Sequence, residues 1–335
     1  NLTGRSRNTI HGSAVLAEFK VNDREKFGKM ELSKELTTRM LTAIIYGAVM
    51  IIFIVPGRWV PMIPLILIAV VAFLSAFEKT QAIRLRQSEV RPLFVAIATV
   101  VLGLFSLLGV LKETLLRGLA PTIDPSVNTV VAPRIFGYYA LFALFILPIV
   151  SLFRMWKKGS DLLPDTVGES FIILSSSIPI ASSIALFYGV RLGWEWFVLA
   201  ILTSWVSDSF SYFAGRLFGR LRFSPQLSPK KTWEGTVGGV VGTILLFLLY
   251  FPLVIGKPSG YNGGASIAFS IIAAVIMSLC ATFGDLINSA IKRWCKIKDF
   301  GSLLPGHGGI SDRFDSIFTT LPAILLLALF ASVVM

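Results

Sequence analysis

Long apolar stretches separated by short polar segments run along nearly the whole chain. A membrane-spanning helix needs about 20 predominantly apolar residues, and nine stretches of this sequence approach or meet that length. They cover residues 37–55, 59–77, 93–111, 135–153, 171–190, 196–214, 236–255, 265–284 and 317–335. The pattern therefore predicts an all-α polytopic membrane protein with about nine transmembrane helices.

Composition agrees with this pattern. Of the 335 residues, 54% are hydrophobic and 15% are charged, and the mean hydropathy is +0.75. Such values lie outside the range of soluble globular domains. The chain is therefore predicted to be an integral membrane protein in contact with the lipid bilayer.

The net charge of +12 is distributed unevenly between alternate polar segments. Basic residues concentrate before the first apolar stretch and near residues 79–91, 154–158, 216–231 and 292–313. Cytoplasmic segments carry such an excess, so the amino terminus is predicted to be cytoplasmic and, with nine helices, the carboxyl terminus outside. Lys79 is interpreted as a loop residue that marks this orientation. Anionic lipid explains the remaining charge, and no nucleic-acid partner is required.

Three parts of the chain differ in character. Residues 1–29 are polar and lack the apolar core of a signal peptide, so we interpret them as a peripheral extension or a vector-derived remnant. Residues 30–195 contain the first five predicted helices and few ionisable side chains within them. Residues 196–335 contain helices six to nine and most of the polar motifs, and we expect the chemistry there.

The sixth apolar stretch contains a carboxylate, Asp208, well inside a predicted helix. An ionised side chain at that depth costs about 2.5–3.5 kcal/mol, so Asp208 should have a partner. Helical spacing places four more residues on its face: Ser211, Tyr212, Gly215 and Arg216. They predict one polar stripe, although simple pairing of Asp208 with a neighbouring helix is the alternative.

Two adjacent lysines, Lys230 and Lys231, precede the seventh stretch. Free backbone N–H groups at a helix start, together with these cations, suit an anionic ligand. Lysines at a membrane boundary also mark orientation, so the pair alone does not establish a site.

The eighth stretch ends in a second polar stripe. Its members recur at helical spacing if the helix continues beyond the apolar part: Asp285, Ser289, Lys292, Arg293 and Lys296. One face would then carry a carboxylate at the membrane edge and cations farther out. A solvated basic helix would explain the cations but not the carboxylate.

A glycine-rich turn, Pro305–Gly309, follows this stripe. Glycines allow N–H groups to approach an anion closely, and His307 is placed either to donate to a phosphate oxygen or to hold the turn. Ser311 is predicted to cap the ninth helix, which would put Asp312 and Asp315 on one face. Two carboxylates this close favour a bound metal ion, with a simple pair at the helix start as the alternative.

Residues 289–315 read S-x-I-K-R-x4-K-D-x-G-x2-L-P-x-H-G-G-I-x-D-R-F-D. This run resembles the signature of the CDP-diacylglycerol synthases, also called phosphatidate cytidylyltransferases. Residues 228–235, S-P-x-K-T-x-E-G, resemble the family's second motif. Asp208 with Ser209 and Tyr212 is similar to the polar part of its preceding helix, so the resemblance covers about residues 203–316.

The resemblance implies an enzyme that transfers CMP from CTP to phosphatidate, giving CDP-diacylglycerol and pyrophosphate. It implies Mg²⁺, with a second monovalent cation such as K⁺, and is compatible with a homodimer. Metal ligands would be Asp285 and Asp312, followed by Asp208 and Asp315. The implied catalytic residues are Asp285, Asp312, Lys292, Arg293 and His307. Contacts with the phosphates of CTP or phosphatidate are implied for Lys230, Lys231, Lys298 and Arg313, and Ser289, Gly308 and Gly309 are further implied binding residues.

Two other readings of the sequence compete with this one. A related CTP-dependent lipid enzyme, such as an ether-lipid CDP synthase or a polyprenol kinase, would share these motifs because acceptor choice depends on apolar grooves. An ion-coupled transporter would use Asp208 and Asp285 along a path across the bilayer, whereas nearly all the polar motifs fall in predicted cytoplasmic positions, with no counterpart outside. We therefore expect an enzyme in a bacterial-type inner membrane, with its active site facing the cytoplasm.

Overall fold

The computed structural model describes residues 40–42, 44–119, 131–255, 263–304 and 308–334. The predicted extension 1–29 and His307 lie outside these residues. The described helices are Met40–Arg58, which ends in the 3-10 turn η1 (Val55–Arg58), α2 (Met62–Arg84), α3 (Pro92–Leu104), α4 (Ser106–Leu119), α5 (Val131–Lys158), α6 (Leu163–Gly189), α7 (Gly193–Phe218), α8 (Trp233–Tyr250), α9 (Gly263–Trp294) and α10 (Ile317–Val334). Two short turns, η3 (Ser160–Leu162) and η4 (Phe251–Ile255), extend α6 and α8.

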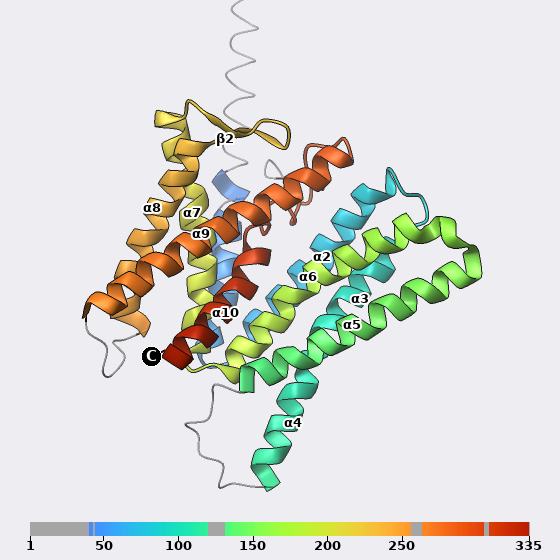
Figure 1. Cartoon of the computed structure of the whole chain (residues 1–335), viewed down its shortest axis with the longest axis horizontal. Helices are drawn as coiled ribbons and strands as arrows, with labels where there is room; N and C mark the ends of the chain where they lie inside the picture. Colours follow the sequence, from blue (N-terminus) through green and yellow to red (C-terminus); the bar gives the residue numbers. More distant parts are fainter. Residues whose placement is uncertain (1–39, 43, 120–130, 256–262, 305–307, 335) are drawn as a thin grey trace, which may run out of the picture.

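The prediction of an all-α polytopic membrane protein is confirmed. Within the described residues, eight helical segments are long and apolar enough to cross a bilayer, and a ninth apolar helix, Ile317–Ser332, is shorter. The third predicted span is divided into α3 and α4 at Phe105. Figure 1 shows these helices side by side, with α4 extending beyond one end of the bundle.

Helix α10 packs against α6, α7 and α9. Its inner side chains Leu321 and Ile324 are fully buried. Buried hydroxyl groups also join these helices, because Ser204 of α7 lies 2.9 Å from Thr320 of α10, and Thr319 donates to the carbonyl of Cys280 on α9 at 2.7 Å. Such interhelical hydrogen bonds compensate for the weak hydrophobic drive between helices in lipid. They hold the first turn of α10 against α7 and α9.

Helices α7 and α8 pack closely through glycines of α8. A Cβ atom at Gly242 would lie 2.4 Å from the ring of Phe210, and one at Gly239 would lie 2.2 Å from the hydroxyl of Ser211. Small residues of this kind let two helix backbones approach within a membrane. The close contact orders the face of α7 that carries Ser211.

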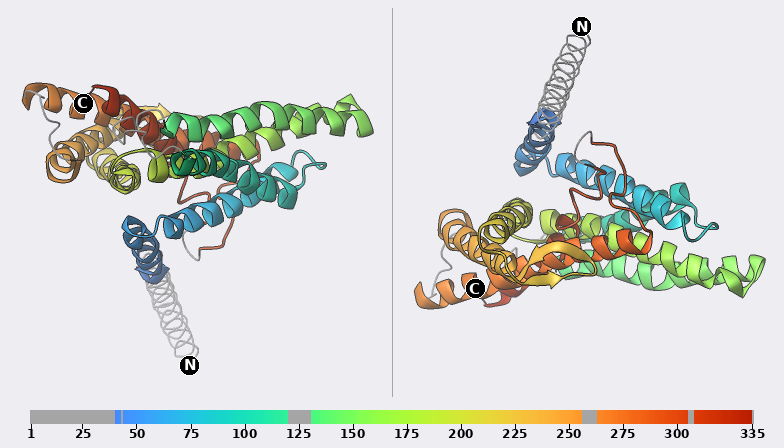
Figure 2. Two further views of the ribbon diagram at one scale, coloured as in Figure 1. Left: turned by 90° about the horizontal axis from the view of Figure 1, so that it is seen from below. Right: turned by 90° about the horizontal axis from the view of Figure 1, so that it is seen from above.

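A two-stranded antiparallel hairpin, β1 (Arg222–Ser224) and β2 (Ser228–Thr232), joins α7 to α8. Thr232 ends the hairpin and caps α8, since its hydroxyl accepts the N–H of Gly235 at 3.1 Å. The hairpin lies at the same end of the bundle as the carboxyl end of α9 (Figure 1), and in Figure 2 it runs along α9. The segments that carry the polar motifs therefore meet at one end of the molecule.

Candidate active site

The predicted polar stripe of α7 lines a cavity of about 460 Å³. The cavity is bounded by α7, β2, the start of α8, and α9. Its lining residues are Asp208, Ser211, Tyr212, Gly215, Arg216, Lys230, Lys231, Thr232, Gly235, Thr236, Thr282 and Asp285. All five members of the α7 stripe are among them, which confirms that they share one face.

Lys231 connects the hairpin to α9. Its Nζ lies 2.6 Å from Oδ2 of Asp285 and 3.4 Å from the carbonyl oxygen of Thr282. The lysine and aspartate side chains are 23% and 28% exposed, so this ion pair is only partly screened by solvent. The neighbouring Lys230 is exposed and also lines the cavity. The hairpin thus brings one paired and one solvent-facing cation to the same cavity.

The stripe on α9 is confirmed for its first part. Ser289 donates to Oδ1 of Asp285 at 3.3 Å, one helical turn apart, and Lys292 reaches Asp312 at 2.8 Å. Arg293 turns toward the hairpin, where its Nε donates to the carbonyl of Leu227 at 3.2 Å.

The inclusion of Lys296 in that stripe is wrong, because α9 ends at Trp294. Lys296 has a left-handed backbone with φ of 58°. Its N–H donates to the carbonyl of Arg293, and the N–H of Ile297 donates to that of Lys292. These two bonds form a Schellman motif, which closes the helix.

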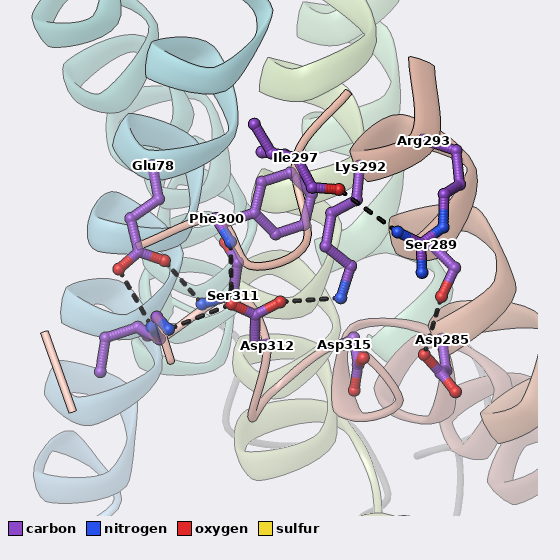
Figure 3. Close-up of polar contacts among 12 residues, drawn as sticks. Glu78, Asp285, Ser289, Lys292, Arg293, Ile297, Phe300, Ser311, Asp312 and Asp315 are labelled. Carbon is purple, nitrogen blue, oxygen red and sulfur yellow. Dashed lines mark hydrogen bonds and ion pairs between the residues drawn. The ribbon is translucent and has the colours of Figure 1, made fainter. Parts of the chain in front are cut away.

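Asp312 holds the glycine turn together. Its Oδ1 accepts the ammonium of Lys292, and its Oδ2 accepts the N–H groups of Phe300 and Gly309 at 2.9 and 3.0 Å. The Asp312 side chain is 6% exposed. Gly308 has φ of +86°, a conformation that favours glycine. Figure 3 shows Asp312 between the end of α9 and the chain segment around Phe300.

The predicted cap at Ser311 is wrong. Helix α10 begins at Ile317, and Asp312 and Asp315 lie in the irregular turn before it. The N–H groups of Ile310 and Ser311 are accepted by the carboxylate of Glu78 on α2, at 3.0 and 2.9 Å. Ile310 and Ser311 therefore lie in a turn that is held by α2, and helix α10 starts only at Ile317.

Three carboxylates converge beside this turn. Oδ2 of Asp208 accepts the hydroxyl of Ser316 at 3.1 Å, and Asp315 accepts the N–H of Ser316 at 2.8 Å. Removal from water, followed by the negative charges of Asp285 and Asp208, raises the pKa of the Asp315 carboxyl well above its usual range. The three carboxyl groups therefore disfavour one another's ionisation, and a cation bound between them would relieve this repulsion.

Carboxylate oxygens are the donors that Mg²⁺ prefers, so the chemistry of Asp208, Asp285 and Asp315 fits the predicted ion. Across the described residues, however, no three acidic, histidine or cysteine side chains are already arranged around one metal position. Lys231 occupies an oxygen of Asp285, and both oxygens of Asp312 are engaged. Lys231 would therefore compete with a divalent ion for Oδ2 of Asp285.

The remaining predicted phosphate contacts differ in their surroundings. Lys298 and Arg313 are exposed. The N–H of Gly309 donates to Asp312, so in this arrangement it is directed into the turn. A phosphate at this turn would depend on side-chain cations or on a rearranged backbone.

Glu78 was not predicted as part of the site, and the prediction that Lys79 lies in a loop is wrong. Lys79 is not in a loop, since it lies within α2, is 3% exposed, and has its Nζ 4.7 Å from the ring centre of Phe318. The sequence did contain a signal for their position, because both residues directly follow a long apolar run. The helix formed by that run, α2, is 23 residues long and includes them. The motifs gave no indication that α2 touches the turn near Asp312.

Acidic and basic side chains meet in this helical membrane protein from four elements: α7, the β1–β2 hairpin, α9 and the turn before α10. This arrangement is the architecture of a membrane-embedded enzyme. The family model of the Cytidylyltransferase family matches residues 37–331. The chain belongs to this family, as the resemblance of its motifs predicted.

Three relatives illustrate the extent of the similarity. The chain is 28% identical over 211 residues to the phosphatidate cytidylyltransferase of Staphylococcus haemolyticus, covering 57% of this chain and 78% of that protein. It is 42% identical over 125 residues to that of Thermotoga maritima, covering 37% of this chain and 46% of the relative. The match to that of Haemophilus influenzae is 27% over 262 residues, covering 75% and 85%.

Proposed function

We propose that this chain transfers CMP from CTP to phosphatidate, giving CDP-diacylglycerol and pyrophosphate. The relatives above carry the name phosphatidate cytidylyltransferase. The observation that carries the proposal is the cavity in which Asp208, Lys231 and Asp285 meet from three separate elements. Its combination of cations and carboxylates suits a nucleoside triphosphate, whose phosphates need both direct neutralisation and a metal ion.

The reaction is a displacement at phosphorus. A phosphatidate oxygen forms a bond to the α-phosphorus of CTP, the bond from that phosphorus to the bridging oxygen breaks, and pyrophosphate leaves with the electron pair. The side chains that can neutralise the phosphate oxygens from the cavity wall are Lys230, Lys231 and Arg216. We also assign Lys292, Arg293, Lys298 and Arg313 to this role, together with His307.

The proposed Mg²⁺ would be held by Asp208, Asp285 and Asp315. When bound, it would neutralise phosphate oxygens and make the α-phosphorus more electrophilic. Asp312 is the weakest of the four predicted ligands, because its oxygens already accept three hydrogen bonds. A second cation such as K⁺, the contacts of Ser289 and Gly308 with nucleotide, and a homodimer stay predictions.

The geometry supports an enzyme over a transporter. A transport path would distribute polar residues across the bilayer, whereas the hairpin, the end of α9 and the turn before α10 lie at one end of the bundle (Figure 1). The distribution of basic residues supports a cytoplasmic position for that end, in a bacterial-type inner membrane. CTP would then enter from the cytoplasm while the acyl chains of phosphatidate remain in the bilayer.

Transfer of radiolabelled CMP by the purified protein in lipid nanodiscs tests the proposal. We expect label in CDP-diacylglycerol and release of one pyrophosphate per product when phosphatidate, CTP and Mg²⁺ are all present. Parallel reactions contain an archaeal-type ether-lipid phosphate or a polyprenol. Transfer confined to the ether lipid, or phosphorylation of the alcohol alone, would show that the chain is one of the related enzymes.

A further inference from the structure

Glu78 of α2 binds the turn that carries Asp312 with both carboxylate oxygens. Oε1 accepts the N–H of Ile310 at 3.0 Å, and Oε2 accepts the N–H of Ser311 at 2.9 Å (Figure 3). Glu78 is 7% exposed. Hydrogen bonds to an ionised acceptor are stronger than neutral ones, and two of them to consecutive residues fix the direction of the backbone.

Ser75 contacts the same turn from one helical turn earlier. Its hydroxyl lies 2.8 Å from the hydroxyl of Ser311, which also reaches the carbonyl of Ser75 at 3.1 Å. Ser75 and Ser311 are both fully buried. Residues three apart share a helix face, so Ser75 and Glu78 form one continuous contact between α2 and the turn.

Two glycines make room for the Glu78 carboxylate. A Cβ atom at Gly309 would lie 2.6 Å from one carboxylate oxygen, and one at Gly301 would lie 2.8 Å from the other. Both distances are too short for any real Cβ atom. The glycines of this segment therefore fit closely around a side chain of α2.

We propose that Glu78 is a positioning residue for the reaction proposed above, on which this inference rests. By holding Ile310 and Ser311, Glu78 keeps Asp312 where it accepts Lys292 and the N–H of Gly309. Lys292 then has one fixed place at the end of α9. Glu78 itself does not touch substrate. It connects the first half of the chain to the segment that carries the chemistry.

Substitution Glu78→Gln tests this role, because glutamine keeps the size of the side chain but turns one acceptor into an NH₂ donor that faces a backbone N–H. We expect kcat for CMP transfer, counted per CTP-binding site, to fall about 10- to 100-fold, since small displacements of reacting groups have effects of this order. The KM for CTP should change much less. Glu78→Asp keeps both acceptors and should recover part of kcat.

The matched control is Glu113→Gln. Glu113 is also a partly buried carboxylate, 12% exposed, and its ion pair with Arg134 at 3.3 Å lies on α4 and α5. It should retain wild-type kcat. Wild-type kcat per CTP-binding site in Glu78→Gln, or an equal loss in Glu113→Gln, would overturn the proposal.

A second measurement is independent of turnover. Hydrogen exchange followed by mass spectrometry should show slow exchange at residues 310–311 in the wild type and faster exchange in Glu78→Gln. If the wild type transfers no CMP to phosphatidate, the proposed function fails, and this exchange difference alone decides the role of Glu78. Unchanged exchange would refute the contact as a constraint on the turn.

Discussion

The acidic side chains of this site have different partners, and those partners distinguish their roles. Asp285 is paired with the movable ammonium of Lys231, whereas Asp312 is bound by Lys292 and two backbone N–H groups. The sequence predicted four carboxylates as metal ligands from their spacing on helices and from the family resemblance. It ranked Asp312 with Asp285, because residue type and spacing do not show which oxygens the backbone already uses.

Asp285→Asn should remove turnover while leaving the fold intact. The substitution removes a charge that would hold the ion, and it also relieves repulsion with Asp208 and Asp315. We expect a loss of about 100-fold or more in kcat with an unchanged unfolding midpoint in detergent. Near-normal kcat at saturating Mg²⁺ would remove Asp285 from the metal site.

Asp312→Asn should lower stability as well as turnover. An amide offers one acceptor oxygen in place of two, so at least one of the three donors around it loses its partner, at a cost of about 1–3 kcal/mol. Thermal unfolding and limited proteolysis in detergent should both show a weaker structure. Asp299→Asn, at an exposed position of the same segment, serves as the control. An unfolding midpoint equal to that of the control would contradict the anchoring role of Asp312.

At the scale of elements, hydrophobic periodicity was informative for long helices and not for short polar segments. The start of α10 was predicted from a local cap at Ser311, whereas the N–H of Ser311 is bound by the carboxylate of Glu78, 233 residues away in the chain, and α10 begins at Ile317. The β1–β2 hairpin has no alternating apolar pattern to reveal it. It is held by contacts with other elements, such as Lys231 with Asp285 on α9.

Close packing of α7 on α8 should be required for folding. Gly242→Val would place a branched side chain where Phe210 already lies, because even the first added carbon would be 2.4 Å from the Phe210 ring. Overpacking of this kind costs about 1–3 kcal/mol, so we expect a lower yield of monodisperse protein and a lower unfolding midpoint. Gly137→Val is the control, because a Cβ at Gly137 has no neighbour within 4 Å. Equal behaviour of the two variants would contradict this packing.

At the scale of the whole molecule, the apolar stretches predicted the helices well, because a bilayer imposes length and composition on every span. The chemistry was predicted within residues 196–335, and two charged residues of the first part also lie next to that region. Glu78 and Lys79 of α2 contact the turn before α10 and its neighbour Phe318. A contact between residues so far apart in the chain leaves no local pattern in the sequence.

The predicted orientation can be tested with single cysteines in a variant that lacks Cys280 and Cys295. Gln226→Cys places a thiol in the hairpin, and Arg191→Cys places one between α6 and α7; both positions are exposed. The hairpin is predicted to be cytoplasmic, so a membrane-impermeant maleimide should label intact cells only at residue 191. Labelling of residue 226 in intact cells would show the opposite orientation.

The most direct test of the account is the anomalous scattering of manganese in crystals grown with Mn²⁺ and CTP. We expect one strong peak coordinated by the carboxylates of Asp208, Asp285 and Asp315, with metal–oxygen distances of about 2.1 Å and with Lys231 moved away from Asp285. A crystal with CTP bound and the manganese elsewhere, or with those three carboxylates still neutralised separately, would contradict it.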